Sequence, residues 1–442
     1  MIYLSNILFA ILLVAGLGFF IRNVKKLIRN INLGRDLDRS DRPDLRWKNM
    51  IKIALGQSKM VRRPVAGILH IIVYLGFIII NIEVLEIIID GLFGSHRIFS
   101  FAGIGYNFLI GSFEILAFLV LVSVILFWIR RMILRIPRFW NKEMTSWPKN
   151  DALNILYFEM VLMTLFLVMN AADFSLQKLG AEHYILAGSF PISGMIANWM
   201  PQDISLLIII ERTAWWLHII GIFVFLNYLY YSKHLHILLA FPNTYFANLN
   251  PEGRFDNLKA VTNEVKLMLD PDADPYSSDS ESDNATPEKF GASDISDLSW
   301  VQLMNAYTCT ECGRCTSVCP ANQTGKELSP RAIMMKTRDR IEEVSILIDK
   351  KGIESFKRDG DDRSLLSTIT DEEIWACTSC NACVTECPVN IDPLSIITDL
   401  RRYLVMEESR APQELNMMMT NIENNGAPWQ YNQLDRLNWK NE

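Results

Sequence analysis

Residues 309–320 read Cys309-Thr-Glu-Cys312-Gly-Arg-Cys315-Thr-Ser-Val-Cys319-Pro320, and residues 377–388 read Cys377-Thr-Ser-Cys380-Asn-Ala-Cys383-Val-Thr-Glu-Cys387-Pro388. Both follow one pattern, C-x2-C-x2-C-x3-C-P, and together they contain all eight cysteines of the chain. The close spacing lets the first three thiolates of a run converge on one [4Fe–4S] cluster, while the fourth reaches the other cluster. The pattern therefore predicts a two-cluster electron carrier.

Structural zinc and disulfides are the competing interpretations of these cysteines. Zinc sites usually take their ligands as two separated pairs, whereas each run here offers four cysteines in close succession and ends in Cys-Pro. Disulfides are disfavoured in the reducing cytoplasm, where the charge pattern described below places both runs. We expect one cluster on Cys309, Cys312, Cys315 and Cys387, and the other on Cys377, Cys380, Cys383 and Cys319.

Five long apolar stretches precede residue 242, and none follows it. Each is long enough to cross the hydrocarbon core as a helix. The first lacks a basic start and a small-residue cleavage site, so we interpret it as a retained helix rather than a signal peptide. The stretches run approximately over Ile2–Ile21, Val65–Ile89, Ile104–Ile129, Leu153–Ala172 and Ile204–Tyr231.

The uneven distribution of lysine and arginine among the loops predicts the orientation in the membrane. The loop from Arg22 to Arg63 contains thirteen of them, four arginines follow the third stretch, and Lys233 follows the fifth. The loops around Asp90–Arg97 and Asp173–Asp203 contain almost none. We therefore expect an integral plasma (inner) membrane protein, in contact with lipid, with its amino terminus outside and both cysteine runs in the cytoplasm.

The segment Asp270–Asp297 is rich in Asp, Glu and Ser and poor in apolar residues, so we expect a flexible tether. It explains most of the net charge of −6. The charge therefore indicates no particular partner, and we expect no nucleic acid. Beyond the tether, Ser329-Pro330 and Asp392-Pro393 each combine a polar cap with a proline at the first helical position. These two starts predict an internal repeat built from helices.

Two histidines in the apolar stretches are candidates for the axial ligands of a b-type haem, which needs one imidazole from each of two neighbouring helices. His70 lies six residues after Pro64, and His236 lies six residues before Pro242. If their helices meet the cytoplasm at these prolines, both histidines sit about 9 Å inside the helix ends. The alternative for a lone histidine on an apolar helix is a packed, hydrogen-bonded core residue.

His234 competes with His236 for this role. His236 follows His218 by eighteen residues, or five helical turns, and so shares its face, whereas His234 points away. We therefore favour His236. His218 lies about 27 Å nearer the outside and is a candidate ligand of a second haem. The number of haems stays open, because the second helix offers Ile80 and Asn81 at that depth.

Two further histidines and several carboxylates lie toward the outer side. We expect His96 and His183 in the outer loops to be surface residues, although either could reach a haem on His218. Charge buried in lipid is costly, so the carboxylates within the apolar stretches need a partner or a function. One interpretation is ion pairing, for example Glu86 with Arg212, and the other is a quinol pocket. The candidate quinone-site residues are Glu83, Glu86, Glu211 and Arg212.

The membrane part resembles the cytochrome b subunit of respiratory nitrate reductase and its relatives. The resemblance lies in His70, His218 and the stretch Ser232-Lys233-His234-Leu235-His236. In that family two fifth-helix histidines eighteen residues apart bind different haems, and a serine precedes the inner one by four residues, as Ser232 precedes His236. Leu69–Gly76 matches the start of the family's second helix, and the family's second histidine there corresponds to Ile80.

The fusion of such a unit to the cysteine runs is similar to membrane oxidoreductases related to heterodisulfide reductase, including proposed electron-transfer-flavoprotein:menaquinone oxidoreductases. In longer members, segments like Gly426–Trp429 and Asp435–Trp439 lead into a cysteine-rich CCG catalytic domain. Because this chain ends three residues after Trp439, we expect that domain on a separately encoded partner. The resemblance implies electron transfer between menaquinone or another quinone, haem b, two [4Fe–4S] clusters and a CCG-domain protein or flavoprotein.

We thus expect an all-α protein with a five-helix transmembrane bundle, an acidic linker and a helical two-cluster domain. Its regions are a membrane haem b domain at 1–245, a linker at 246–298, a double [4Fe–4S] domain at 299–410 and a docking tail at 411–442. The tail carries Trp429, Tyr431 and Trp439 in a polar setting, so it either anchors a partner or folds back on the cluster domain. The competing function is a ferredoxin-type docking module on an inert, haem-free membrane anchor.

Overall fold

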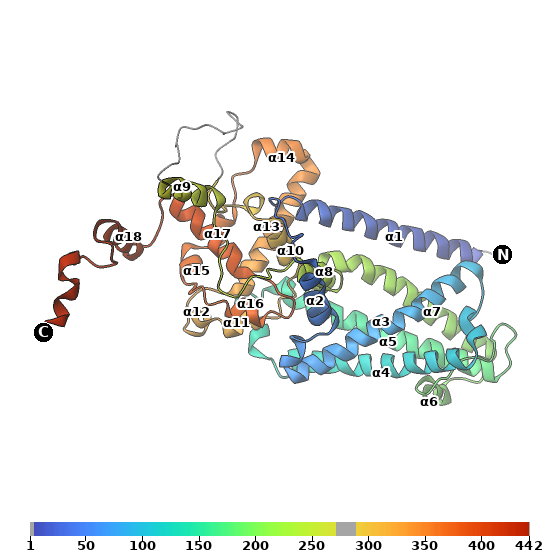
Figure 1. Ribbon diagram of the computed structural model, residues 1–442. Helices are drawn as coiled ribbons and strands as arrows, with labels where there is room; N and C mark the ends of the chain where they lie inside the picture. Colours follow the sequence, from blue (N-terminus) through green and yellow to red (C-terminus); the bar gives the residue numbers. More distant parts are fainter. Residues whose placement is uncertain (1–3, 271–288, 442) are drawn as a thin grey trace.

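The computed structural model describes residues 4–270 and 289–441, and within these ranges it contains helices and no strands (Figure 1). Five helices are long and apolar enough to cross a membrane, as the sequence predicts. The predicted start of the first stretch at Ile2 lies outside the described residues. The five helices are α1 Leu4–Ile31, α3 Pro64–Phe93, α4 Ile104–Met132, α5 Ser146–Lys178 and α7 Ile204–Tyr228.

The membrane bundle is held together by an apolar core between these helices. The pairs α5–α7, α3–α4 and α4–α5 pack along their lengths, and α1 lies at the margin against α3 and α7. Buried aromatic side chains such as Phe113 and Phe166 fill the centre. The outer surfaces carry exposed apolar residues, including Val14 on α1 and Phe108 on α4. An apolar outer surface around a helical bundle is what a lipid environment requires, so the chain is an integral membrane protein.

The fifth membrane helix does not continue to Pro242, contrary to our expectation from the sequence. After α7 come two short turns, η6 Leu229–Tyr231 and η7 Lys233–Leu235, and then a separate helix, α8 His236–Tyr245. Ser232 between the turns has extended backbone, and its hydroxyl accepts a hydrogen bond from His234 N. The serine thus caps a new helix start. Our argument that His218 and His236 share one continuous helical face therefore fails.

The cluster domain contains the predicted internal repeat. Helix α11 packs against α16, and α13 packs against α17. The helix starts predicted at the two polar-proline pairs are confirmed, because Ser329 and Asp392 cap α13 and α17 with their side chains. Its helices are α10 Trp300–Thr308, α11 Arg314–Val318, α12 Pro320–Gln323, α13 Pro330–Lys351, α14 Ile353–Asp359, α15 Asp371–Trp375, α16 Ala382–Glu386 and α17 Pro393–Met406.

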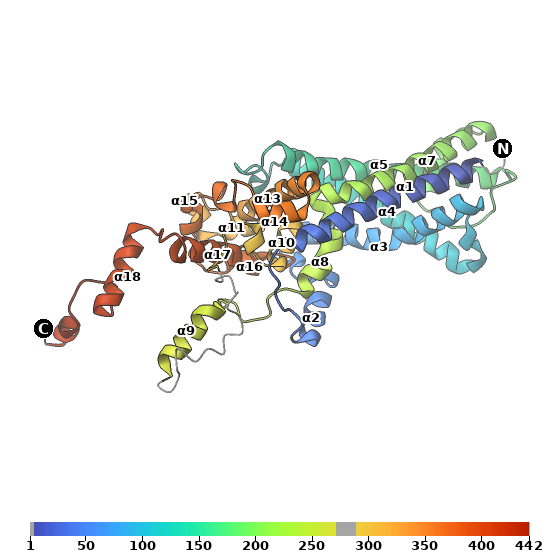
Figure 2. The same ribbon diagram turned by 90° about the horizontal axis from the view of Figure 1, so that it is seen from above.

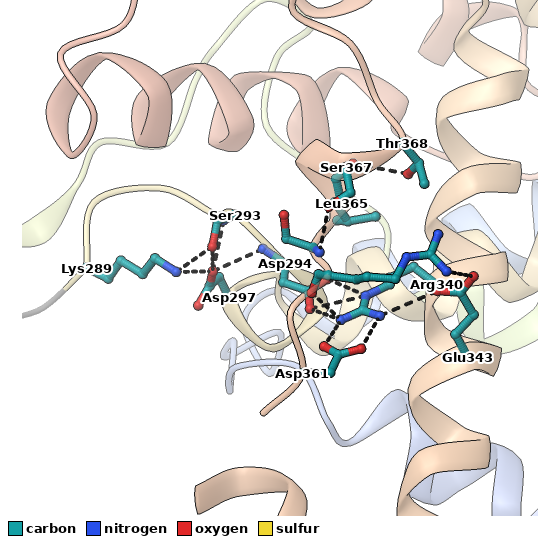
Figure 3. A network of polar contacts seen from close by, with 12 residues as sticks. Lys289, Ser293, Asp294, Asp297, Arg340, Glu343, Asp361, Leu365, Ser367 and Thr368 are labelled. Carbon is teal, nitrogen blue, oxygen red and sulfur yellow. Dashed lines mark hydrogen bonds and ion pairs between the residues drawn. The ribbon is translucent and has the colours of Figure 1, made fainter. Parts of the chain in front are cut away.

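Residues 289–298 pack against the cluster domain and are bound to it by hydrogen bonds. Arg340 on α13 is buried and binds the carboxylates of Asp294 and Asp361 together with the carbonyl of Arg363 (Figure 3). Ala292, Ile295 and Leu298 belong to the domain core. Of the predicted tether, residues 271–288 lie outside the described residues, and α9 Lys259–Leu269 precedes them.

The membrane and cluster parts share one apolar core at the junction (Figure 2). Leu27 and Ile31 at the end of α1, and Leu235 and Leu239 around α8, pack together with the cluster-domain core. In the connecting loop Arg35 pairs with residues around Ser299 through backbone hydrogen bonds. The cluster domain is thus docked on one end of the bundle (Figure 1).

Shorter elements complete the chain. The tail beyond α17 extends away from the rest of the molecule in both ribbon views (Figures 1 and 2). The shorter helices and turns are α2 Pro43–Met50, η1 Ile51–Leu55, η2 Met60–Arg62, η3 Ile98–Ala102, η4 Pro137–Phe139, α6 Ser193–Ile196, η5 Ala197–Trp199, η8 Ile295–Asp297, η9 Leu365–Ser367, α18 Gln413–Asn425 and η10 Gln433–Lys440.

Candidate functional site

The eight cysteines gather in two pockets, and each pocket takes residues from both runs. Cys383 lines both pockets. All eight are free thiols. The first pocket is lined by Cys309, Cys312, Cys315 and Cys387, and the second by Cys319, Cys377 and Cys380, each with Cys383 in addition. The fourth cysteine of each run therefore lies with the first three of the other run.

The two cysteine loops adopt the same backbone shape. Glu311 and Ser379, each directly before the second cysteine, have positive φ angles of 53° and 56°. Gly313 and Asn381, each directly after it, also have positive φ. Such turns point successive side chains inward around a compact group. Glycine and asparagine adopt this conformation at low cost, so the sequence fits the fold locally.

The chemistry of the pockets fits a cluster better than a single ion. Among the described residues, no three His, Cys, Asp or Glu side chains gather closely enough to hold one metal ion. A structural zinc site would need four ligands at about 2.0–2.3 Å, whereas a [4Fe–4S] cube spreads its four thiolates over separate iron atoms. Burial raises the pKa of the Cys309 thiol to about 12 and that of Cys387 to about 11. Burial thus disfavours the charged thiolates, and a cationic group such as iron would stabilise them.

The loop of the first run is anchored directly on the membrane part. Lys233, the first residue of η7, forms a buried ion pair with Glu311 and donates to Pro148 O at 2.7 Å. Arg314 donates to Lys59 O at 3.2 Å. Burial raises the pKa of Glu311, but Arg338 and Lys233 outweigh it, so the pKa of Glu311 lies below its ordinary value. Glu311 is therefore a charged carboxylate, and its contact with Lys233 is an ion pair between the membrane part and the cluster domain.

The structure brings His70 and His236 together. Their ring centroids lie 6.4 Å apart. These two histidines would hold a b-type haem, which takes one imidazole from each of two neighbouring helices. His236 Nδ1 lies 3.0 Å from Lys233 O, which fixes the ring and leaves Nε2 for a metal. His70 Nδ1 is buried without a hydrogen-bond partner.

His234 and His218 have other surroundings. The ring of His234 lies 5.4 Å from that of His236, and its Nε2 lies 3.5 Å from Glu159 Oε1. The buried His218 contacts Leu162 O through Nδ1 at 3.0 Å and lies beside Phe166. The residues described around His218 include no second histidine in ring contact with it. The structure thus gathers His70, His234 and His236 at the end of the bundle next to the cluster domain and places His218 apart from them.

A cavity of about 270 Å³, which we call the outer cavity, is lined by residues of α1, α3, α5 and α7 and of the loops beside them. It lies at the end of the bundle remote from the cluster domain. All four candidate quinone-site residues line it, whereas His218 does not. Its wall includes the aromatic group of Phe9, Trp215 and Trp216, whose ring centroids lie 5.1–6.3 Å apart. The polar lining is formed by Ser5, Asn6, Glu83, Glu86, Asp90, Ser95, His96, Arg97, Asp173, His183, Glu211 and Arg212.

The sequence does not predict that Arg97 is the central cation of this cavity. Arg97, in the loop between α3 and α4, is buried and pairs with Asp173 at 2.6 Å and with Glu83 at 3.7 Å. The loop contains almost no other basic residue, and a single arginine gives no pattern that marks it as buried. The expectation that His96 is a surface residue is also wrong, because only 9% of its side chain is exposed and it bonds Asp173 at 3.1 Å.

The ion pair suggested between Glu86 and Arg212 is wrong. Arg212 pairs with Glu211, its neighbour in the chain. Glu86 instead accepts hydrogen bonds from Phe99 N and Tyr106 Oη, each at 2.9 Å. Glu114 on α4 accepts hydrogen bonds from the backbone N–H groups of residues 192 and 193. The buried carboxylates thus accept hydrogen bonds from backbone, hydroxyl and cationic donors, many of them on distant segments.

These features define a membrane-bound iron–sulfur protein of the electron-transfer class. Residues 308–391 match the family described as 4Fe-4S dicluster domain. The chain is 29% identical to the probable iron-sulfur-binding oxidoreductase FadF of Bacillus subtilis, over 99% of this chain and 61% of the relative. It is 25% identical to the EtfAB:quinone oxidoreductase of Syntrophomonas wolfei, over 92% of this chain and 55% of the relative.

A third relative matches only part of the chain. The chain is 30% identical to a probable membrane-anchored ferredoxin of Chromohalobacter salexigens, over 34% of this chain and 24% of the relative. The chain spans 55% to 61% of the length of the two relatives that it matches along most of its own length. No solved structure matches it.

Proposed function

We propose that this chain is a membrane-bound electron-transfer subunit of a quinone-linked oxidoreductase. In this proposal it passes electrons between menaquinone or another quinone in the outer cavity, a haem b on His70 and His236, and two [4Fe–4S] clusters. A haem b supplies one-electron oxidation and reduction at its iron. A separate cytoplasmic partner, either a CCG-domain iron–sulfur protein or an electron-transfer flavoprotein, exchanges electrons with the cluster domain.

The observation that carries this proposal is the contact between the histidine pair and the first cysteine pocket. Lys233 holds Glu311 of the first run with its ammonium group, and its carbonyl lies within hydrogen-bond distance of His236 Nδ1. On α8, Asn243 donates to Val389 O just after the second run at 2.8 Å. The segment that carries the histidine ligand thus touches both cysteine runs, as a continuous electron path requires.

We propose the orientation from the charge distribution of the loops. The junction with the cluster domain is the arginine- and lysine-rich side and faces the cytoplasm. The outer cavity then lies near the opposite membrane surface, where a lipid-soluble quinone arrives from the bilayer. Of the eight described cysteines, Cys380 is the exposed one, so we place the partner's electron entry or exit near the second pocket.

Spectroscopy of the purified full chain tests this function. We expect about eight cluster iron atoms per protein and the reduced spectrum of a low-spin b-type haem. We also expect a soluble naphthoquinol to reduce that haem. A protein that binds both clusters but shows no haem band would instead support a ferredoxin-type module on an inert anchor. The likeness to a probable membrane-anchored ferredoxin makes this second candidate worth separating.

A further inference from the structure

Five carboxylates line the outer cavity, and four of them have both oxygens engaged. Glu86 accepts from Phe99 N and Tyr106 Oη, and Glu211 accepts from Tyr184 Oη and Arg212. Asp90 accepts from Ser95, Arg97 N and residue 98, and Asp173 accepts from His96, Arg97 and Gln177. These four carboxylates therefore stabilise the cavity wall, and each of their oxygens already accepts a hydrogen bond from the protein.

Glu83 is different. It is 2% exposed, and its Oε2 is buried without a hydrogen-bond partner. Its Oε1 has only the distant Arg97 guanidinium, at 3.7 Å. A buried carboxylate oxygen that makes no hydrogen bond is costly, so such an atom in a cavity wall indicates a ligand that donates to it.

The position of Glu83 fits a flat ligand with a hydroxyl at one end. Glu83 lies two helical turns below Asp90, which is close to the outer end of α3, so it belongs to the deep part of the cavity. The aromatic group of Phe9, Trp215 and Trp216 provides a wall on which a planar ring can stack. The Arg97 guanidinium lies 3.7 Å from Glu83 Oε1 and places a cation beside this carboxyl group. A hydroquinone fits both features, because it has a planar ring that can stack and a hydroxyl group that can donate its proton to a buried carboxylate.

We infer that Glu83 is the catalytic residue that exchanges a proton with a hydroxyl of the quinol bound in this cavity. The inference rests on the proposed function and assigns its acid–base group. On oxidation one O–H bond of the hydroquinone breaks, its proton passes to Glu83, and the second proton leaves to water at the exposed His183. The two electrons would leave one at a time to the haem and clusters of the proposed function. Reduction of a quinone runs the same steps in reverse.

His96, Asp173 and Arg97 act as positioning residues for Glu83. Both ring nitrogens of His96 are in use, since Nε2 bonds Asp173 and Nδ1 lies 3.4 Å from Ile185 N. Asp173 in turn holds Arg97, which faces Glu83. The exposed His183 lies beside His96, with ring centroids 5.6 Å apart, and opens the cavity toward the outer loop. The chain of contacts thus runs from the deep carboxylate to the surface.

The test compares Glu83→Gln with wild type in the full chain, in lipid nanodiscs loaded with haem and clusters. Dithionite, which bypasses the cavity, should reduce the haem of both proteins with the same spectrum. With a soluble naphthoquinol, we expect kcat for haem reduction in Glu83→Gln to fall about 100-fold or more, with KM changed far less. The matched control is Glu182→Gln, which removes an exposed carboxylate of the outer loop that does not line the cavity, and should keep the wild-type rate.

The outcomes separate this inference from the proposed function. A wild-type kcat in Glu83→Gln, with wild-type protein reduced by the naphthoquinol, overturns the inference alone. Wild-type protein that the naphthoquinol cannot reduce, although dithionite can, overturns both. If Glu83→Gln does not assemble, Glu83→Asp decides, because it keeps the acid but moves it: a slowed rate supports the inference, and an unchanged rate overturns it.

Discussion

Lys233 and Glu311 form a buried ion pair that joins the membrane bundle to the loop of the first cysteine run. Both side chains are almost fully buried. Glu311 also accepts from Arg338 at 2.6 Å, so one carboxylate binds a cation from each part of the molecule. Because charges removed from water must be compensated, this joint fixes how the two parts dock.

We predict that Lys233→Met weakens the docking without abolishing it. Removing one partner of a buried pair typically costs about 3–5 kcal/mol, but Glu311 keeps Arg338, so we expect a loss of roughly 1–3 kcal/mol. Thermal unfolding of the cluster domain in detergent measures it. Lys142→Met is the control, because Lys142 is 93% exposed and its pairing with Glu327 at 3.8 Å should contribute almost nothing. Equal stability of both variants would contradict the joint.

The two clusters should respond crosswise to mutation. Cys319 lies in the second pocket with three cysteines of the second run, and Cys387 lies in the first. We therefore expect Cys319→Ser to damage the second-run cluster and Cys387→Ser to damage the first-run cluster, as seen by electron paramagnetic resonance and iron analysis. Each variant is the control of the other. If each mutation instead damaged the cluster of its own run, the shared ligation would be wrong.

The haem should depend on His70 and His236 but not on His234. His236 has Nδ1 fixed on Lys233 O, whereas His234 faces Glu159. Alanine at either ligand should remove the low-spin, six-coordinate absorption spectrum, since one imidazole cannot hold that state alone. His234→Ala should retain the spectrum. Loss of the haem on His234→Ala alone would show that the histidine pair is wrongly assigned.

The helices of this fold could be predicted from the sequence, whereas some of the points at which one helix ends and the next begins could not. Long apolar stretches and two cysteine runs have strong local patterns, so the five membrane helices and the repeat of α13 and α17 could be predicted. The break at Ser232 could not, because apolar residues continue on both sides of it. That His70 and His236 are neighbours could be predicted, although the continuous helix assumed for this argument does not exist.

The polar wall of the outer cavity was only half predictable. Carboxylates within apolar stretches stand out by their cost in lipid, which is why Glu83 and Glu211 could be named. Arg97 could not, because its burial depends on how the outer loop folds back over α5 toward Asp173. Which carboxylate keeps a free oxygen depends likewise on backbone and hydroxyl donors from distant segments, and no spacing in the sequence encodes those contacts.

Arg340 should be essential for the cluster domain. Its side chain is 2% exposed and binds Asp294 and Asp361, which ties residues 289–298 to α13 (Figure 3). Arg340→Met leaves two partly buried carboxylates uncompensated, so we expect a loss of about 3–5 kcal/mol. Thermal unfolding followed through loss of cluster absorption measures it. Arg363→Met, at a half-exposed side chain paired with Glu343, should change stability little.

The tail is predicted to dock the soluble partner. In the structure it does not fold back on the cluster domain, and Trp429, Tyr431 and Trp439 are 53%, 69% and 69% exposed. Exposed aromatic side chains of this kind anchor protein contacts, since they bury large areas at little entropic cost. We expect deletion of residues 425–442 to leave the haem and cluster spectra intact but to slow electron exchange with a CCG-domain protein. As a control, dithionite should still reduce the truncated chain fully. A truncated chain that reduces the partner at the wild-type rate would rule out the tail as the docking element and leave the exposed edge near Cys380 as the contact.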